Sequence, residues 1–249
     1  MIKETIRAAA YATAPRFVVD RYLRFRMLDE ARRLGRLRDA TDDASILMDS
    51  LGRSHMFRPL QKTSEILKLI EIVKHLKPMT ICEIGAAGCG TTFLLAQAAA
   101  KAATIIALDL AFDPSRKAAL ETFALPGQRL LCLEADSHRP ETARLVAETL
   151  GERSLDVLYL DGDHSYDGVK RDFELYRDLV SSNGMIVFHD IVSDYKTRYG
   201  ITTTSDTGGV PKFWQEIKTS WKRVEEIVED YEQDGYGIGI LYCDDASTE

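Results

Sequence analysis

The 249-residue sequence predicts an α/β fold built on a mostly parallel sheet. From residue 59 onward, short apolar runs alternate with helical patterns, which is the order typical of parallel strands joined by crossover helices. Most of these apolar runs also stop at acidic residues, histidines or glycines. Because ligands bind beyond the carboxyl ends of the strands in such sheets, this arrangement indicates a binding site along one edge.

Seven strands are expected, with helical patterns before and between them. Pro78 ends the first of these helices, because proline cannot continue a helix. The expected strands are 80–84, 104–108, 129–133, 156–160, 185–188, 223–228 and 236–242. The expected helices are 63–76, 91–103, 114–123, 140–150, 165–179 and 211–219. The polar segment 192–210 is interpreted as a substrate lid, with Gly200, Gly208 and Gly209 as hinges.

Residues 1–58 are expected to form an N-terminal helical extension to a domain over residues 59–249. Residues 17–37 carry apolar side chains at helical spacing among many arginines. The arginines could form a basic face for a nucleic acid or an anionic membrane. Acidic residues interrupt the positive charge, which favours a stripe that packs on the main domain or on another subunit. A second helix is expected at 43–51, with Thr41 or Asp42 as its N-cap.

Composition narrows the setting and the partners. The net charge of −7 argues against a general nucleic-acid binder. The four cysteines form no CxxC pair, which suits a reducing cytoplasm. No apolar run reaches the ~20 residues needed to cross a bilayer, and the N-terminus lacks the apolar core of a secretory signal. We therefore expect a cytoplasmic protein without a membrane partner, and the helix at 17–37 as a candidate contact for a homo-oligomer.

A glycine-bearing turn follows the first strand, which contains Glu83. Its glycines, Gly85, Gly88 and Gly90, do not form GxGxxG, so the turn alone is a weak signal. The ends of the next two strands add to it. Asp109 is placed to accept hydrogen bonds from both hydroxyls of a ribose. Asp136, beside Ser137, could accept one from the exocyclic amine of adenine.

Acidic residues and histidines also follow the fourth and fifth strands. Asp161 and Asp190 offer the hard oxygen ligands that suit Mg²⁺ or Mn²⁺. His164 is a plausible general base because its ordinary pKa is near neutral. Two assignments stay open at this point. His189 either ligates, which would favour a softer metal, or points elsewhere, and Asp163 is either a third ligand or a solvent-facing residue of the turn.

Together these motifs resemble the class I S-adenosylmethionine-dependent methyltransferases over roughly residues 59–242. The segments LDVLYLDGDHSYDGVKRDFELY, GMIVFHDI and GVPKFWQEIK further resemble the metal-dependent small-molecule O-methyltransferases related to cephalosporin-biosynthesis and macrolide-sugar enzymes. This resemblance implies a Rossmann-like, seven-stranded sheet with helices on both faces and an antiparallel last strand. It also implies Glu83 and the glycine turn at the methionine end of the cofactor, Asp109 at the ribose, and Asp136 with Ser137 at the adenine.

In relatives of this kind, the position of Asp161 is a metal ligand and that of His164 is the base. The expected function is methyl transfer from S-adenosylmethionine to a hydroxyl of a glycoside, polyketide or phenol, with a divalent metal, Mg²⁺ or alternatively Mn²⁺. The expected ligands are Asp161, His189 and Asp190. The alternative is a non-catalytic cofactor-binding or assembly protein with the same fold. A nucleotide-dependent oxidoreductase is disfavoured by the missing GxGxxG.

Overall fold

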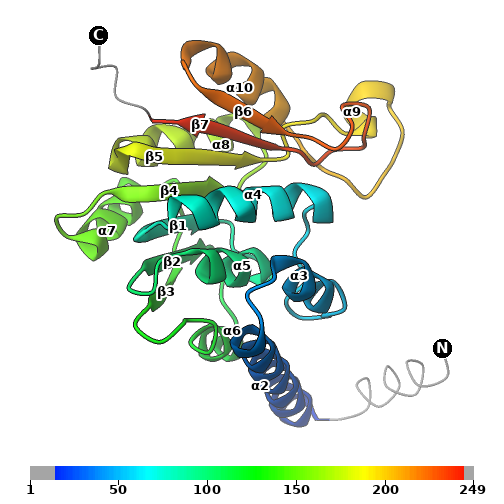
Figure 1. Ribbon diagram of the computed structural model, residues 1–249. Coiled ribbons are helices and arrows are strands. Elements are labelled where there is room, and N and C mark those ends of the chain that lie inside the picture. The colour runs from blue at the N-terminus through cyan, green and yellow to red at the C-terminus, as the bar shows by residue number, and fades with distance from the viewer. Residues whose placement is uncertain (1–14, 244–249) are drawn as a thin grey trace.

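The computed structural model describes residues 15–243 and centres on a seven-stranded sheet (Figure 1). The strand order is β3-β2-β1-β4-β5-β7-β6, with β1 to β5 paired in parallel and β7 antiparallel to both of its neighbours. The predicted fold class is therefore confirmed. The strands are β1 Thr80–Ile84, β2 Thr104–Asp109, β3 Arg129–Glu134, β4 Leu155–Leu160, β5 Val180–His189, β6 Val224–Ile227 and β7 Ile238–Tyr242.

Alternate strand residues face two separate layers of helices. In β1, Ile81 packs into one core and Cys82 into the other. Figure 1 shows α4 and α5 across the face of the sheet toward the viewer. That layer contains α4 Thr63–Leu76, α5 Gly90–Ala98 and α6 Pro114–Leu120. The opposite layer contains α7 Pro140–Leu150, α8 Tyr166–Tyr176 and α10 Val210–Ile217, with Phe213 and Trp214 buried in its core.

The strand order reverses between β1 and β4, which creates a crevice at their carboxyl ends. Ile84 pairs with Leu160, so the residues that follow, Gly85 and Asp161, are brought together. A Cβ atom on Gly85 would lie 2.0 Å from the carbonyl oxygen of Asp161, and Gly85 has a φ of +88°. Glycine is therefore required here, because the chain turns left-handed against a neighbouring backbone.

Several element boundaries differ from those expected. Helix α5 ends at Ala98, because the Ala100 amide donates to the Pro78 carbonyl and turns the chain toward β2. The expected N-cap of the second N-terminal helix is wrong. Asp43 caps it, accepting a 2.8 Å hydrogen bond from the Ser45 amide. Strand β5 starts five residues earlier than the apolar run indicated, because polar residues 181–183 continue the extended backbone.

The N-terminal helices α2 Arg16–Ala40 and α3 Ala44–Gly52 flank the layer of α4, α5 and α6. The C-terminal half of α2 buries Met27, Ala31 and Leu34, and Arg38 donates to backbone carbonyls after α6. The first turns of α2 instead leave apolar side chains at the surface, namely Phe17, Val18, Leu23 and Phe25. The apolar stripe thus packs on the main domain along only part of its length.

The secretory-signal expectation concerns the N-terminus, and residues 1–14 lie outside the described residues. Within residues 15–243, none of the helices has the length and apolar character that crossing a membrane requires.

Candidate functional site

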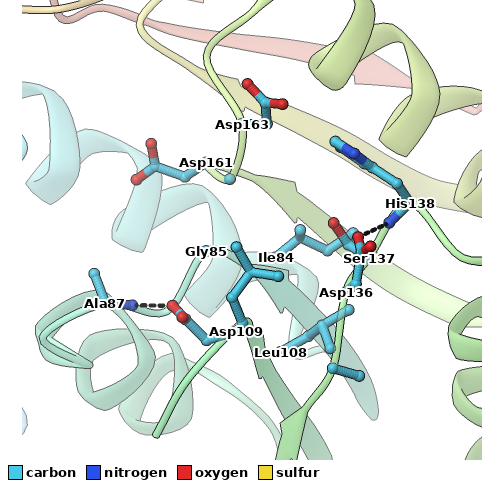
Figure 2. Close-up of a pocket in the computed structure, with 13 residues that line it drawn as sticks. Ile84, Gly85, Ala87, Leu108, Asp109, Asp136, Ser137, His138, Asp161 and Asp163 are labelled. Atoms are coloured by element: carbon cyan, nitrogen blue, oxygen red, sulfur yellow. Dashed lines mark hydrogen bonds between the residues drawn. The ribbon is translucent and has the colours of Figure 1, made fainter.

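A cavity of about 530 Å³ opens at the carboxyl ends of β1, β2 and β4 (Figure 2). It is lined by four of the residues predicted to bind a cofactor, together with Asp161, the first predicted metal ligand. The cofactor residues among its walls are Gly85, Asp109, Asp136 and Ser137. Residues separated by up to 52 positions in the sequence therefore meet around one space, as their places at strand ends predicted.

The glycine turn at residues 85–90 approaches backbone on both of its sides. At Gly90 a Cβ atom would lie 2.2 Å from the Phe57 carbonyl oxygen, whereas at Gly88 the nearest atom is 3.5 Å away. Only Gly85 and Gly90 are therefore demanded by close packing. Gly88 and Gly90 line a smaller adjoining pocket of about 30 Å³, which also includes Asp161.

Asp109 is held on the cavity wall by backbone amides, as Figure 2 shows for Ala87. Its Oδ2 accepts from the Ala87 amide at 2.8 Å and its Oδ1 from the Ala111 amide at 3.2 Å. A carboxylate has about four acceptor positions, so both oxygens keep capacity for a ligand in the cavity.

Asp136 uses its carboxylate largely within its own loop. Its oxygens accept from the His138 amide at 3.0 Å and from Arg139 Nε at 3.1 Å. The hydrogen bond from the His138 amide holds the pKa of this carboxyl below its usual range. His138 also lines the cavity. Its only sequence signal is its place directly after Asp136 and Ser137.

Glu83 lies beneath the cavity rather than on its wall. Its side chain is buried and accepts a hydrogen bond from the Thr92 hydroxyl. Burial raises the pKa of Glu83 to about 8, so the protein without ligands holds this carboxyl largely protonated at neutral pH.

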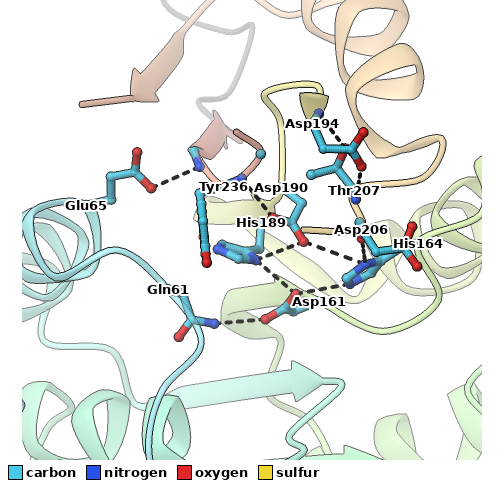
Figure 3. A network of polar contacts seen from close by, with 12 residues as sticks. Gln61, Glu65, Asp161, His164, His189, Asp190, Asp194, Asp206, Thr207 and Tyr236 are labelled. Carbon is cyan, nitrogen blue, oxygen red and sulfur yellow. Dashed lines mark hydrogen bonds and ion pairs between the residues drawn. The ribbon is translucent and has the colours of Figure 1, made fainter. Parts of the chain in front are cut away.

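The second group of predicted residues forms one polar cluster, which we define as Asp161, His164, His189 and Asp190 (Figure 3). His189 Nδ1 lies 3.1 Å from Asp161 Oδ1 and 3.4 Å from Asp190 Oδ2. His164 lies 3.6 Å from each of the same two carboxylates, through Nε2 to Asp161 and Nδ1 to Asp190. The ends of β4 and β5 thus bring the four residues together.

The charges in the polar cluster compensate one another. Burial alone would raise the pKa of Asp161, but the neighbouring His189 and His164 outweigh it and hold that pKa below its usual range. The hydrogen bond with Asp161, against the opposing effect of burial, raises the pKa of His164 to about 9. Burial would lower the pKa of His189, but Asp161 and Asp190 raise it above its usual value.

The donor atoms in the cluster fit a divalent cation. Ligand atoms of Asp161, His164 and Asp190 all lie within 4.8 Å of one another. Two carboxylates and an imidazole suit several divalent metals, and such a cation would take over the charge compensation that two protonated histidines provide. The Nε2 atom of His189 is buried without a hydrogen-bond partner among the described residues.

Asp163 stands apart from the polar cluster, in the turn that leads into α8. Its side chain is exposed, and its Oδ1 accepts from the Ser165 amide at 2.8 Å. It lines the 530 Å³ cavity.

The segment 192–210 is anchored rather than free at its C-terminal end. The buried Asp194 accepts hydrogen bonds from the amides of Thr197 and Thr207, at 2.7 and 2.9 Å. His164 Nδ1 lies 2.6 Å from the Asp206 carbonyl oxygen. A Cβ on Gly208 would lie 2.2 Å from the His164 carbonyl oxygen.

Gly208 and Gly209 therefore allow close backbone packing, which is a poor place for the hinges that the sequence suggested. The Gly209 amide donates to the His164 carbonyl at 2.7 Å, and a Cβ there would lie 2.4 Å from the Tyr166 amide nitrogen. The third expected hinge, Gly200, ends the short helix α9 Tyr195–Tyr199 and has open space around it.

Gln61 is a member of the site that the sequence did not reveal. Its Nε2 donates to Asp161 Oδ2 at 2.9 Å, and its Oε1 accepts from the Thr91 hydroxyl at 2.9 Å. It thereby joins the turn below the cofactor cavity to the polar cluster. A residue 100 positions from its partner, outside any motif, offers no local sequence signal.

The family described as "Methyltransferase domain" matches residues 82–191, a range that holds the glycine turn, Asp109, Asp136 and the polar cluster. This match agrees with the predicted resemblance over the same part of the chain. A stretch of 42 residues, 17% of the chain, is 48% identical to "Uncharacterized protein R132" of Acanthamoeba polyphaga mimivirus. The match covers 19% of the viral protein's length.

Among solved structures, the chain is similar to an O-methyltransferase from Bacillus cereus in complex with SAH. The TM-score is 0.57 at 15% identity, over 90% of this chain and 97% of the other. It is also similar to the O-methyltransferase TomG from Streptomyces achromogenes, involved in tomaymycin synthesis and solved with SAM. Here the TM-score is 0.55 at 16% identity, over 81% and 90% of the two chains. The predicted resemblance to class I methyltransferases is confirmed.

Proposed function

We propose that this protein transfers a methyl group from S-adenosylmethionine to a hydroxyl of a small molecule, assisted by a divalent metal. One observation carries the proposal: Asp161 belongs both to the wall of the 530 Å³ cavity and to the polar cluster. A cofactor in the cavity and an acceptor hydroxyl at the cluster would therefore meet at this residue. Such alignment is a main source of rate in group transfer.

The cavity fits the cofactor because backbone forms one side of it and a fixed carboxylate another. S-adenosylmethionine supplies an already activated methyl group when bound. Asp109 accepts from its ribose hydroxyls, and Asp136 with Ser137 lies at its adenine. Glu83 and the turn at residues 85–90, including Gly85, Gly88 and Gly90, lie at its methionine end. Glu83 is largely protonated in the protein without ligands. Once it gives up its proton, its carboxylate can pair with the ammonium group of the cofactor's methionine part.

The polar cluster orients and activates the acceptor. Asp161 and Asp190 would hold a divalent ion, Mg²⁺ or Mn²⁺, together with His189, whose Nδ1 lies 3.1 and 3.4 Å from their carboxylates. The ion would lower the pKa of a bound hydroxyl. His164 would take the proton from that hydroxyl in its neutral form, after the cation has replaced the positive charge that a pKa of about 9 gives His164 in the protein without ligands. The Asp206 carbonyl oxygen lies within hydrogen-bond distance of Nδ1, which leaves Nε2 to receive it.

The acceptor belongs to the glycosides, polyketides or phenols, because a cation at the cluster needs an acceptor oxygen to act on. The cysteines support a reducing, cytoplasmic setting, since Cys82, Cys89 and Cys132 are free thiols. The N-terminal extension, residues 1–58, supports a homo-oligomer through the exposed Phe17 and Phe25 of α2.

Calorimetric titration with S-adenosylmethionine and with NAD, each with and without Mg²⁺ or Mn²⁺, tests this function. We expect binding of S-adenosylmethionine and weak or no binding of NAD. Mass spectrometry of reactions with phenols and glycosides should then find a product about 14 Da heavier than its acceptor, because replacing a hydrogen by a methyl group adds CH₂. NAD binding without S-adenosylmethionine binding would contradict the proposal. Cofactor binding without any methylated product would favour the non-catalytic alternative.

The metal is tested separately. Exhaustive chelation should abolish turnover, and added Mg²⁺ or Mn²⁺ should restore it. Activity that survives both chelation and the Asp161→Asn substitution would remove the metal from the proposal.

A further inference from the structure

Three successive residues before β7 adopt left-handed backbone: Gly235, Tyr236 and Gly237 have φ values of 78°, 63° and 83°. The flanking positions require glycine. A Cβ on Gly235 would lie 2.0 Å from Ser205 Oγ, and one on Gly237 would lie 2.8 Å from Val192 Cγ2. Tyr236 is the exception, because a bulky side chain in this conformation costs free energy that glycine or asparagine would avoid.

The surrounding structure holds the turn firmly in place. The Tyr236 amide donates to Asp190 Oδ1 at 3.1 Å, and its carbonyl accepts from the Val192 amide at 2.9 Å. The next amide, of Gly237, donates at 2.9 Å to Glu65, a buried carboxylate on α4. Gln233 Nε2 donates to the other oxygen of Glu65 at 2.8 Å. Backbone strain persists where neighbouring contacts over-determine it, and such places cluster at functional sites.

Both hydrogen bonds that hold Tyr236 in this conformation are made by its backbone. Glycine would make the same two hydrogen bonds without strain, so the fold alone gives no reason for tyrosine here. The large aromatic side chains of the core, such as Trp214 and Phe188, are fully buried, whereas Tyr236 is half-buried. The ring is therefore more than filling for the interior.

The turn presents this ring to the polar cluster. The rings of Tyr236 and His189 meet edge to face, with centroids 6.3 Å apart at 67°. Figure 3 shows the Tyr236 ring beside His189, with its hydroxyl end directed toward the side of Gln61. Tyr236 is absent from the lining of the 530 Å³ cavity, so it borders the cluster away from the proposed cofactor position.

We propose that Tyr236 is an acceptor-binding residue, held at the polar cluster by the strained turn so that its ring packs against a ring of the acceptor. This rests on the proposed function and deepens it, because it assigns a cyclic acceptor with a flat apolar face, whose hydroxyl reaches the cluster. Aromatic side chains bind such faces with large contact area and little loss of rotamer freedom.

The test compares Tyr236→Gly with Tyr236→Phe in the full chain, with S-adenosylmethionine and Mg²⁺. Two acceptor probes are used, 3,4-dihydroxybenzoate and methyl glucopyranoside. Tyr236→Gly relieves the left-handed strain, so its melting temperature should be equal or higher. Its KM for the methylated probe should rise about tenfold, while kcat changes less and the affinity for S-adenosylmethionine stays the same. Tyr236→Phe keeps the ring and should keep KM near that of the wild type.

Lys77→Gly is the matched control. Lys77 also has a left-handed φ, of 51°, but it is exposed at the end of α4, before the opposite end of β1. Its replacement should also relieve strain and leave KM unchanged.

An unchanged KM in Tyr236→Gly would overturn the assignment while leaving the proposed function intact. A lowered melting temperature of Tyr236→Gly together with weakened cofactor binding would also overturn it, because the ring would then stabilise the folded protein rather than bind the acceptor. If the wild type binds S-adenosylmethionine but methylates neither probe, the cyclic acceptor class is wrong. If it does not bind S-adenosylmethionine at all, the proposed function itself fails.

Discussion

The two halves of the candidate site are built by different means. The half at the ends of β1, β2 and β3 is shaped by backbone: a glycine turn, amides that fix Asp109, and a loop that satisfies Asp136 internally. The half at the ends of β4 and β5 is assembled from two carboxylates and two histidines. Each histidine lies within 3.6 Å of both carboxylates.

The supports of the two halves differ as well. The first half depends mainly on contacts between neighbouring strands and the loops that follow them. The second depends on distant groups, since Gln61 orients Asp161, Asp206 contacts His164, and the Tyr236 turn binds Asp190. A cavity shaped by backbone suits one cofactor, and a charged cluster braced by groups from distant parts of the chain suits chemistry on a particular acceptor. The difference therefore predicts that substitutions in the two halves separate cofactor affinity from turnover.

The largest separation is expected for His164→Ala. Loss of the base should lower turnover roughly a hundred- to ten-thousand-fold, the usual worth of general-base catalysis, while the affinity for S-adenosylmethionine is retained. Rates measured with saturating cofactor, alongside calorimetry, check this. His138→Ala is the control from the other half and should affect affinity more than turnover. Unchanged turnover in His164→Ala would remove this residue from the mechanism.

Asp109→Ala should produce the opposite pattern. Hydrogen bonds to a charged acceptor are worth enough that the Kd for S-adenosylmethionine should rise roughly ten- to a hundredfold. Turnover at saturating cofactor should change little. Asp136→Ala should weaken binding less, because both of its oxygens already accept from its own loop. Equal losses of affinity in the two variants would show that Asp109 has no special role at the ribose.

Asp194→Asn tests whether the anchored segment positions His164. In this variant the side-chain NH₂ group of asparagine would face the Thr207 amide, so two donors would oppose each other and the hydrogen bond would be lost. The neighbouring Asp206 carbonyl should then move away from His164 Nδ1. Partners that orient a site residue are typically worth ten- to a hundredfold, so we expect turnover to fall about tenfold with cofactor affinity unchanged.

Asp206→Ala is the matched control, since only the backbone carbonyl of this exposed residue contacts His164. Its turnover should equal that of the wild type. If Asp194→Asn and Asp206→Ala behave alike, the segment does not act through His164.

A further effect is the pH dependence of cofactor binding through Glu83. The folded pKa of about 8 lies above the ordinary 4.5, so stability from the protonated form is present below pH 4.5 and lost as the pH rises through 8. Binding that needs the ionised form should release a proton. The affinity for S-adenosylmethionine should therefore rise by up to about tenfold per pH unit between pH 6 and 8.

Calorimetry in buffers of different ionisation enthalpy measures the proton released. Glu83→Gln cannot ionise, so the contribution of this residue to the pH slope should disappear. A slope identical in Glu83→Gln and wild type would place the titrating group elsewhere.

Much of the fold was predictable because alternation of strand and helix patterns is a local property. All seven strands were expected, because short apolar runs such as 80–84 are typical of strands that are buried on both faces. Boundaries were less predictable. The end of α5 depends on a hydrogen bond from Ala100 to Pro78, and the start of β5 on the pairing of Val180 with Leu155 across a register shift, so neither is visible in local pattern.

The residues of the candidate site also divide into those marked by a local sequence pattern and those that depend on distant contacts. Asp109, Asp136, Asp161 and Asp190 follow strands directly, so the rule that ligands bind at strand carboxyl ends was enough to group them. Gln61, Glu65 and Tyr236 were missed. Each acts through a partner 46 to 172 positions away, and no short motif marks such a pair.

The sequence by itself determined the class of fold, the order of its strands along the chain and the chemistry offered at each strand end. These follow from hydrophobic periodicity and from residue type, which are local. Only the tertiary structure decided that Asp161 faces both the cavity and the polar cluster, that Asp163 stands outside the cluster, and that Gly208 packs against His164. Those outcomes depend on how loops from distant strands pack together, because each loop's backbone and charges must be satisfied by the others.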